Sequence, residues 1–155
     1  MRQTCKQLLD EYQKRRRVYE AEKLTFAGVD GKDVYNIAAP IIHNDEFLLP
    51  ARVEPRESEY SEVVFFHLDQ GMWYPKEGIR TFSLQDPFWT RIKGELVFGG
   101  VEVFPHPTIP NALGWRTNFY RGTSPDKLEY FASGPDGMPG PSDCRDAGPL
   151  TRRLR

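Results

Sequence analysis

Leu48-Leu49-Pro50-Ala51-Arg52-Val53-Glu54 indicates the fold, because a similar phrase, Leu96-Val97-Phe98-Gly99-Gly100-Val101-Glu102, returns 48 residues later. The runs that follow are also alike, since Ser61–Phe66 resembles Trp115–Tyr120. Self-similarity near 50 residues, built from residues that favour strands, is typical of successive blades of a β-propeller. A propeller usually has at least about four blades, whereas this chain has room for about two such units.

Composition and charge narrow the class of protein. Hydrophobic residues make up 39% of the 155 residues and aromatic residues 13%, which is enough for the packed core of one domain. The formal net charge of −1 gives no electrostatic reason to expect nucleic acid or an anionic membrane as a partner. The chain has no run of about 18 apolar residues, and its charged N-terminus does not resemble a signal peptide. We therefore expect a soluble, cytoplasmic protein.

Familiar cofactor and catalytic motifs are missing from the sequence. It contains no Gly-x-Gly-x-x-Gly, no phosphate loop, no His-Glu-x-x-His and no Gly-x-Ser-x-Gly. Cys5 and Cys144 lie near opposite ends of the chain, without the spacing of a zinc site or a disulfide framework. We expect no metal and no organic cofactor.

One helix is predicted, over residues 3–22, within an N-terminal segment 1–22 that packs outside the strands. Its apolar residues recur near helical spacing at Cys5, Leu8, Leu9, Tyr12 and Tyr19. The basic run 14–17 favours a solvated helix face over a nucleic-acid contact, because the overall charge is balanced.

Residues 23–137 read as the blades of an incomplete propeller. Short strands alternate with turn formers, which predicts an all-β meander. The strands are expected at 24–28, 34–42, 47–49, 62–67, 72–74, 91–92, 95–103, 115–120 and 128–132. The turns between them are expected at 29–32, 43–45, 69–71, 93–94 and 122–126.

Residues 138–155 have a different composition. This segment is rich in proline and glycine, has no aromatic residue and shows no strand or helix period. Such a segment cannot bury much surface, so we expect it to be disordered or loosely attached. Two interpretations stay open: a natural flexible tail, or an accidental extension in a shifted reading frame.

Four stretches together resemble a known family. Val34–Pro40, Ala51–Glu54, Leu84–Phe88 and Gly99–Pro107 are similar to a bacterial and protozoan family catalogued as domain of unknown function 1861, and the match covers about residues 4–137. The resemblance implies the five-bladed β-propeller of carbohydrate-active enzymes. More distantly, the same phrases resemble glycoside hydrolase family 130, the mannoside phosphorylases and mannosidases.

The resemblance also implies a function and a length. Family members are about twice as long, so this chain corresponds to an N-terminal part of a propeller. The complete protein is expected to cleave a glycosidic bond of a mannoside-like oligosaccharide or glycoside, by hydrolysis or with inorganic phosphate as co-substrate. Groups from later blades are absent, so the chain alone is expected to be inactive and to self-associate through exposed blade edges. The alternative is a non-catalytic propeller that binds carbohydrate or protein.

Asp86 is the candidate catalytic residue. As a general acid it would protonate the glycosidic oxygen, directly or through a sugar hydroxyl, and Pro87 would hold it extended. The alternative is that Asp86 only bonds backbone amides where a strand opens. In the distant relatives an acidic residue precedes this aspartate, whereas this chain has Gln85.

Five further residues are candidates for holding the sugar. Arg52 and Glu54 alternate on one face of a strand, either turned inward to bind hydroxyls or paired on the solvent face of an edge strand. Asn36 would donate to a hydroxyl, or satisfy a buried turn. Glu102, which matches Glu54 in the repeat, and His106, between two prolines, complete the set, each with a structural role as the alternative.

Overall fold

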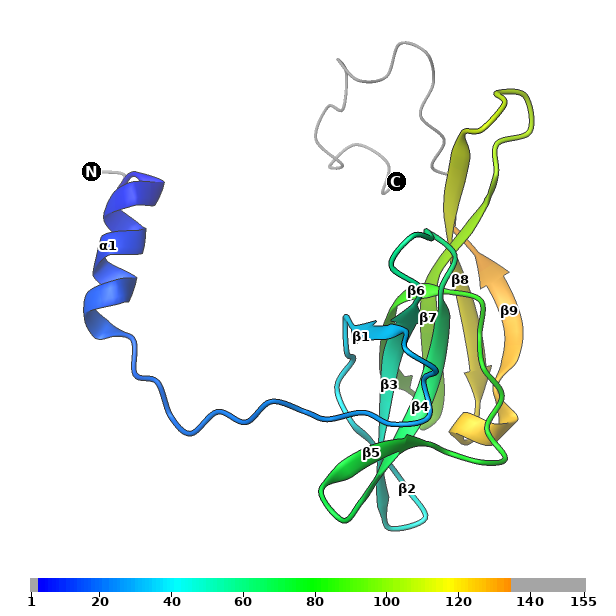
Figure 1. Cartoon of the computed structure of the whole chain (residues 1–155), viewed down its shortest axis with the longest axis horizontal. Coiled ribbons are helices and arrows are strands. Elements are labelled where there is room, and N and C mark those ends of the chain that lie inside the picture. Colours follow the sequence, from blue (N-terminus) through cyan, green and yellow to red (C-terminus); the bar gives the residue numbers. More distant parts are fainter. Residues whose placement is uncertain (1–2, 135–155) are drawn as a thin grey trace.

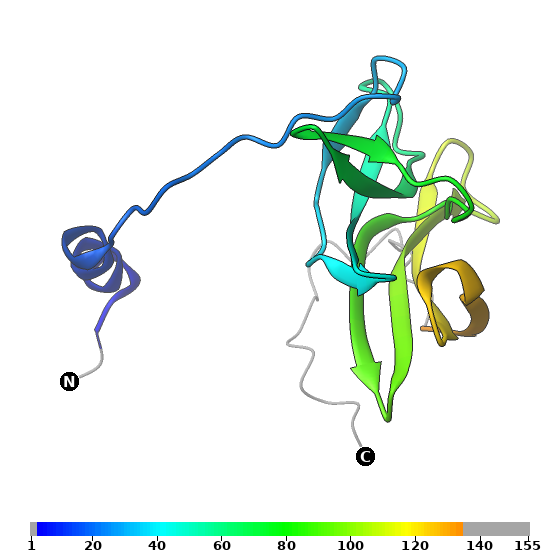
Figure 2. The same cartoon turned by 90° about the horizontal axis from the view of Figure 1, so that it is seen from below.

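The computed structural model describes residues 3–134, which form one helix and two antiparallel sheets. The predicted tail 138–155 lies outside the described residues. The helix α1 spans Cys5–Arg15 and begins with a capping box between Thr4 and Gln7. No residue of α1 is buried, and Figures 1 and 2 show the helix apart from the sheets, at the end of an extended linker.

The helix is therefore shorter than predicted and is not packed on the strands. Residues 16–22 are not helical. A helix without packing depends on propensity alone, and propensity is low at the β-branched Val18 and at the aromatic Tyr19. The run of four cations that ends at Arg17 adds like-charge repulsion at the same place.

The remaining elements form two blade-like sheets, as the all-β prediction required. Sheet 1 has the order β1-β3-β4-β5, with β2 also paired to β3, and sheet 2 has the order β6-β7-β8-β9. All pairs are antiparallel, and the curled sheets agree with a partial propeller (Figure 1). The strands of sheet 1 are β1 Asp33–Tyr35, β2 Ile41–His43, β3 Glu46–Glu54, β4 Glu62–Asp69 and β5 Met72–Pro75. Sheet 2 contains β6 Gln85–Ile92, β7 Glu95–Pro105, β8 Leu113–Gly122 and β9 Glu129–Ser133, with a 3-10 turn, η1, at Pro125–Lys127.

Tight turns join the hairpins where they were predicted. Asn44-Asp45, Gln70-Gly71 and Lys93-Gly94 each connect paired strands, and both residues of each pair have positive φ. This is the conformation that two-residue hairpins require, and Asn, Asp and Gly adopt it readily. The local turn chemistry therefore determined these three hairpins.

The predicted first hairpin, between 24–28 and 34–42, is wrong. The chain does turn at Asp30-Gly31, but β1 pairs with β3, and Phe26 forms only an isolated bridge with Trp73. The physical reason is burial, because Phe26 packs edge-on against Phe66 at 4.9 Å on the outer face of sheet 1. A local pairing would have left that face uncovered.

The main core lies between the two sheets. Phe65 of sheet 1, Phe98 of sheet 2 and Phe82 of the connecting segment form an aromatic cluster with ring centroids 5.0–6.1 Å apart. Trp89 adds a hydrogen bond across the junction, from its indole nitrogen to the Ala39 carbonyl at 2.7 Å. Burial and this bond fix the two sheets relative to each other.

The two sheets repeat, but in a register that differs by one residue from the sequence repeat. In sheet 1 Tyr35 pairs with Arg52, and at the same place in sheet 2 Gln85 pairs with Val101. Val101 therefore occupies the position in sheet 2 that Arg52 occupies in sheet 1, whereas the sequence repeat aligned Arg52 with Gly100. A shift of one residue exchanges the two faces of a strand.

Candidate functional site

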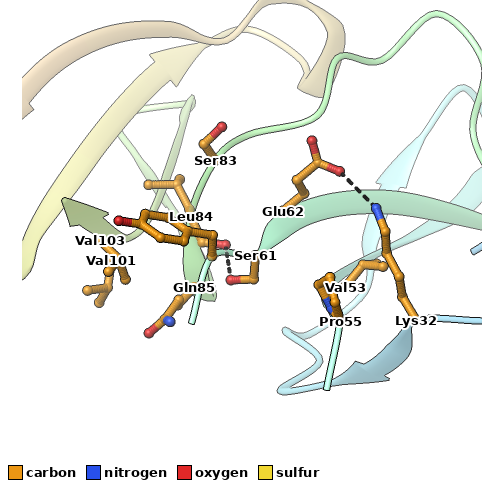
Figure 3. Close-up of a pocket in the computed structure, with 11 residues that line it drawn as sticks. Lys32, Val53, Pro55, Ser61, Glu62, Ser83, Leu84, Gln85, Val101 and Val103 are labelled. Atoms are coloured by element: carbon orange, nitrogen blue, oxygen red, sulfur yellow. Dashed lines mark hydrogen bonds and ion pairs between the residues drawn. The ribbon is translucent and has the colours of Figure 1, made fainter. Parts of the chain in front are cut away.

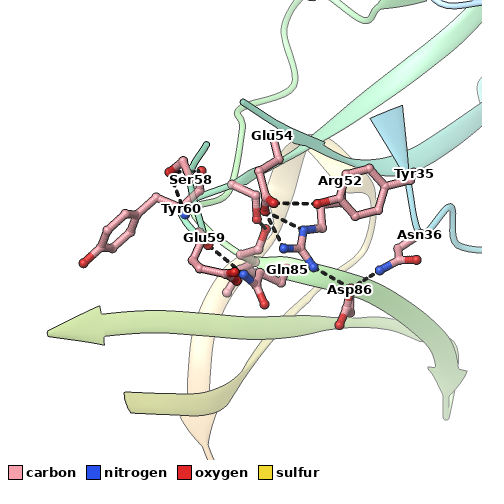
Figure 4. Close-up of polar contacts among 11 residues, drawn as sticks. Tyr35, Asn36, Arg52, Glu54, Ser58, Glu59, Tyr60, Gln85 and Asp86 are labelled. Atoms are coloured by element: carbon pink, nitrogen blue, oxygen red, sulfur yellow. Dashed lines mark hydrogen bonds and ion pairs between the residues drawn. The ribbon is translucent and has the colours of Figure 1, made fainter. Parts of the chain in front are cut away.

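A buried ion pair forms the centre of the candidate site. Arg52 and Glu54 lie on β3 and are each 8% exposed, and the Arg52 Nε donates to Glu54 Oε2 at 2.8 Å (Figure 4). A second guanidinium nitrogen donates to the same oxygen. Because β3 lies between β1 and β4, the alternative of a solvent-facing pair on an edge strand is wrong.

Tyr35 completes the environment of this pair. Its hydroxyl donates to Glu54 Oε1 at 2.6 Å, and its ring centroid lies 4.9 Å from the Arg52 guanidinium carbon. Tyr35 comes from the neighbouring strand β1, directly opposite Arg52. The sequence analysis missed this residue, because nothing in the chain indicated which strand would lie beside Arg52.

Asp86 comes from sheet 2 and joins the cluster across the sheet junction. Its Oδ1 accepts hydrogen bonds from the Arg52 guanidinium at 3.2 Å and from the Asn36 side-chain amide (Figure 4). The Asp86 side chain is nevertheless 52% exposed. The structure thus brings together four of the six predicted residues: Asn36, Arg52, Glu54 and Asp86.

Asn36 and Asp86 hold the same unusual backbone conformation at the same place in the two sheets. Asn36 follows Tyr35, which pairs with β3, and Asp86 follows Gln85, which pairs with β7. The backbone angle φ is +46° at Asn36 and +48° at Asp86. The prediction that Pro87 holds Asp86 extended is therefore wrong. The reason is the irregularity between Gln85 and Phe88, which turns the backbone into the left-handed region. Non-glycine residues held there are often found at functional sites.

The surroundings of the cluster set its charges. Burial by itself would lower the pKa of Arg52, but the hydrogen bond and negative charge of Glu54, with the hydrogen bond of Asp86, outweigh burial and raise that pKa. Burial, followed by the hydrogen bond to Glu54, raises the pKa of the Tyr35 hydroxyl. Arg52 is thus a permanent cation and Tyr35 a neutral donor. A fixed cation beside carboxylates is suited to polar, hydroxyl-rich or anionic ligands.

Glu102 and His106 lie apart from the cluster in the described structure. Glu102 accepts from Arg116 at 2.6 Å and from Asn118 at 2.8 Å, and the hydrogen bond from Arg116 is the main reason why its pKa is lowered. His106 Nδ1 accepts from the backbone amide of Ile109 at 3.0 Å and so caps its own loop. No hydrogen bond or ion pair within residues 3–134 joins either side chain to Asp86.

The one-residue shift explains the position of Glu102. The sequence repeat aligned it with Glu54, but the strand pairing places Val103 at the position that corresponds to Glu54. Glu102 therefore faces the opposite side of its sheet.

A pocket lies at the sheet junction beside the cluster (Figure 3). Its volume of about 310 Å³ is at the small end of ligand sites, and its walls combine apolar and polar side chains. Gln85, the neighbour of Asp86, lines it and donates to the Glu59 carbonyl at 2.6 Å. The lining residues come from both sheets and their connections: Lys32, Val53, Pro55, Tyr60, Ser61, Glu62, Ser83, Leu84, Gln85, Val101 and Val103.

Comparison with protein families agrees with the resemblance noted in the sequence. The family described as Protein of unknown function (DUF1861) matches residues 10–143. The chain belongs to this family. Among proteins of curated function, none matches it. No helix within residues 3–134 is long and apolar enough to cross a membrane.

Three solved structures are similar to this family member, and two of them are described as enzymes that act on mannose. A GDP-Man-dependent mannosyltransferase from Leishmania mexicana is 35% identical with a TM-score of 0.75, over 88% of this chain and 43% of that protein. A mannose phosphorylase from the same organism, solved with a phosphate ion, is 36% identical with a TM-score of 0.73, over 86% and 42%. A hypothetical protein from Leishmania major is 34% identical with a TM-score of 0.70, over 86% and 43%. The chain thus spans less than half the length of these relatives.

Proposed function

We propose that this chain is the N-terminal part of an enzyme that cleaves a mannosidic bond with phosphate or water. The observation that carries the proposal is the Asp86 carboxyl group, which is anchored through Oδ1 but has a side chain that is half-exposed. The anchors are Arg52 and Asn36, so the carboxyl group is oriented before any substrate arrives. The similar mannose-processing structures support a mannosyl group as the substrate.

In this mechanism Asp86 is the general acid. Its Oδ1 is occupied by Arg52 and Asn36, so the proton is carried by Oδ2 and passes to the glycosidic oxygen, directly or through a sugar hydroxyl. Asn36, Arg52 and Glu54 contact the sugar hydroxyls. Inversion requires water or phosphate on the opposite face of the sugar, with the partner base, or the phosphate, more than about 6.5 Å from the acid. We propose that later blades supply the groups that bind this nucleophile, and that the chain alone is inactive.

The strand registers support further blades, and we propose five in all. Phe65 pairs with Pro50, and Phe119 pairs with Gly99 at the corresponding place in sheet 2. Phe65 is buried between the sheets, whereas Phe119 faces away from sheet 1 and contacts the exposed Phe88 and Phe131. Another sheet packed on this aromatic row would bury it as sheet 2 buries Phe65.

The test is substitution of the matching aspartate, Asp86→Asn, in a full-length family member. Turnover of mannosyl glycosides is measured with and without inorganic phosphate, and mannose binding is measured by calorimetry. We expect kcat to fall by about 100-fold or more, the usual contribution of a general acid, while binding is retained. Unchanged turnover would refute the role of Asp86, and binding without turnover in the unmodified protein would favour a non-catalytic platform.

A further inference from the structure

The helix α1 presents an apolar stripe that no residue between 3 and 134 covers. Cys5, Leu8, Leu9 and Tyr12 follow the i, i+3, i+4, i+7 spacing of one helix face, and all are exposed. An isolated helix of 11 residues is marginal in water, and its stability normally comes from packing such a face. The position of α1 away from both sheets therefore requires a partner surface (Figures 1 and 2).

Sheet 1 has an apolar groove of suitable character. It has a volume of about 580 Å³, and its apolar walls include Phe47, Leu49, Leu68 and Trp73. Phe47 and Leu68 are more than half exposed at its surface. Leu24, at the end of the linker that carries α1, also lines it. Contiguous apolar surface of this kind usually marks an interaction site.

The charges of the two surfaces are complementary. Residues 3–17 carry five cations, at Lys6 and in the run 14–17, against the two acids Asp10 and Glu11. The acids of the groove are Asp45 and Glu46, and Asp69 follows Leu68 directly. Glu46 already pairs with Lys76 at 2.6 Å, so Asp45 and Asp69 are the acids that face a basic partner. A basic helix beside an acidic rim gains favourable electrostatic steering on approach.

We propose that α1 of one copy docks in this groove of a second copy, and that the exchange is reciprocal. The extended residues 16–23 lead α1 away from sheet 1 of its own copy (Figure 1). Both the helix stripe and the groove are therefore open to a partner. Two-fold symmetry then forms each contact twice. The occupant is a second copy because the chain itself carries both complementary surfaces. This inference does not depend on the proposed function.

Solution mass tests the proposal in the full chain. At micromolar concentration, light scattering is expected to give twice the chain mass of 17.9 kDa. Leu8→Glu on the helix and Leu68→Glu in the groove should each weaken dimerisation by at least about 100-fold. The reason is that the dimer buries each leucine and contains the contact twice, so one substitution places a charge in both contacts. Ile92→Glu, at a residue as exposed as Leu68 but outside the groove, is the matched control.

Cross-linking separates exchange between copies from other self-association. In a Cys144→Ser background, the natural Cys5 and an engineered Leu68→Cys are joined by a short bis-maleimide. A covalent dimer on a denaturing gel supports the proposal. A cross-link within one chain, no cross-link, a monomeric wild-type chain, or a dimer that survives Leu8→Glu would each overturn it. Circular dichroism of every variant shows whether the sheets remain folded.

Discussion

Arg52 is the residue whose loss should affect the fold most sharply. Arg52→Met keeps much of the side-chain volume but leaves Glu54 buried, with Tyr35 as its one remaining hydrogen-bond donor among the contacts described. Removing one partner of a buried ion pair typically costs about 3–5 kcal/mol, because the other charge stays desolvated. For a domain whose total stability is on the order of 5–15 kcal/mol, this is a large fraction.

The assay is urea unfolding followed by tryptophan fluorescence. Trp89 is suited to this because it bonds across the sheet junction near the cluster. We expect a lower urea midpoint for Arg52→Met with an unchanged slope, which indicates a loss of stability and not a change in the unfolded state. Arg56→Met is the matched control, because Arg56 is bidentate to Asp33 but is largely exposed. Its midpoint should hardly change.

A double variant decides whether the cost comes from the unpaired charge. Arg52→Met with Glu54→Met removes both charges, and apolar replacements of a buried pair are often neutral. The double variant should therefore be more stable than Arg52→Met alone, with a coupling free energy of at least about 2 kcal/mol. Additive losses, or a cost below about 1 kcal/mol for Arg52→Met, would refute the reasoning.

Two further predictions concern sheet 2. Gly100→Ala should destabilise the chain by about 1–3 kcal/mol, because the added Cβ would lie 2.7 Å from the Gln85 carbonyl oxygen. Gly134→Ala is the control, because its Cβ would meet nothing closer than 3.7 Å. Thermal melts should show a lower melting temperature for Gly100→Ala only, and equal melting temperatures would contradict this. Arg116 lowers the pKa of Glu102 in the folded chain below its unfolded value near 4.5. Ionised Glu102 therefore stabilises the fold at pH values above 4.5, and this contribution is lost as the pH falls through the lower folded pKa. Glu102→Gln should therefore reduce stability at pH 7 and have less effect at pH 3, and an equal effect at both pH values would exclude this linkage.

Features of the chain that are local in sequence could be predicted from the residues. Each of the three two-residue turns has Asn, Asp or Gly at a position of positive φ, although Gln70 and Lys93 occupy the first position in two of them. Alternation placed Arg52 and Glu54 on one face, and the family resemblance identified Asp86 and Asn36 beside them. The sheets confirm that these four side chains meet.

Features that depend on long-range pairing could not be predicted. Tyr35 reaches Glu54 because β1 pairs with β3, and burial of Phe26 on the outer face of sheet 1 accompanies that pairing. Glu102 was aligned with Glu54 because sequence similarity does not detect a register shift of one residue. The end of α1 was placed too late because the apolar periodicity continues to Tyr19, although nothing packs there.

Asp86 and the two residues that anchor it come from different sheets. Asn36 and Arg52 belong to sheet 1 and Asp86 to sheet 2, so the angle between the sheets sets the position of the carboxyl group. A substitution that changes the size of Phe82 or Trp89, whose side chains pack in the core between the sheets, would shift one sheet against the other. Core substitutions are therefore expected to change the orientation of the Asp86 carboxyl group without altering Asn36, Arg52 or Asp86 itself.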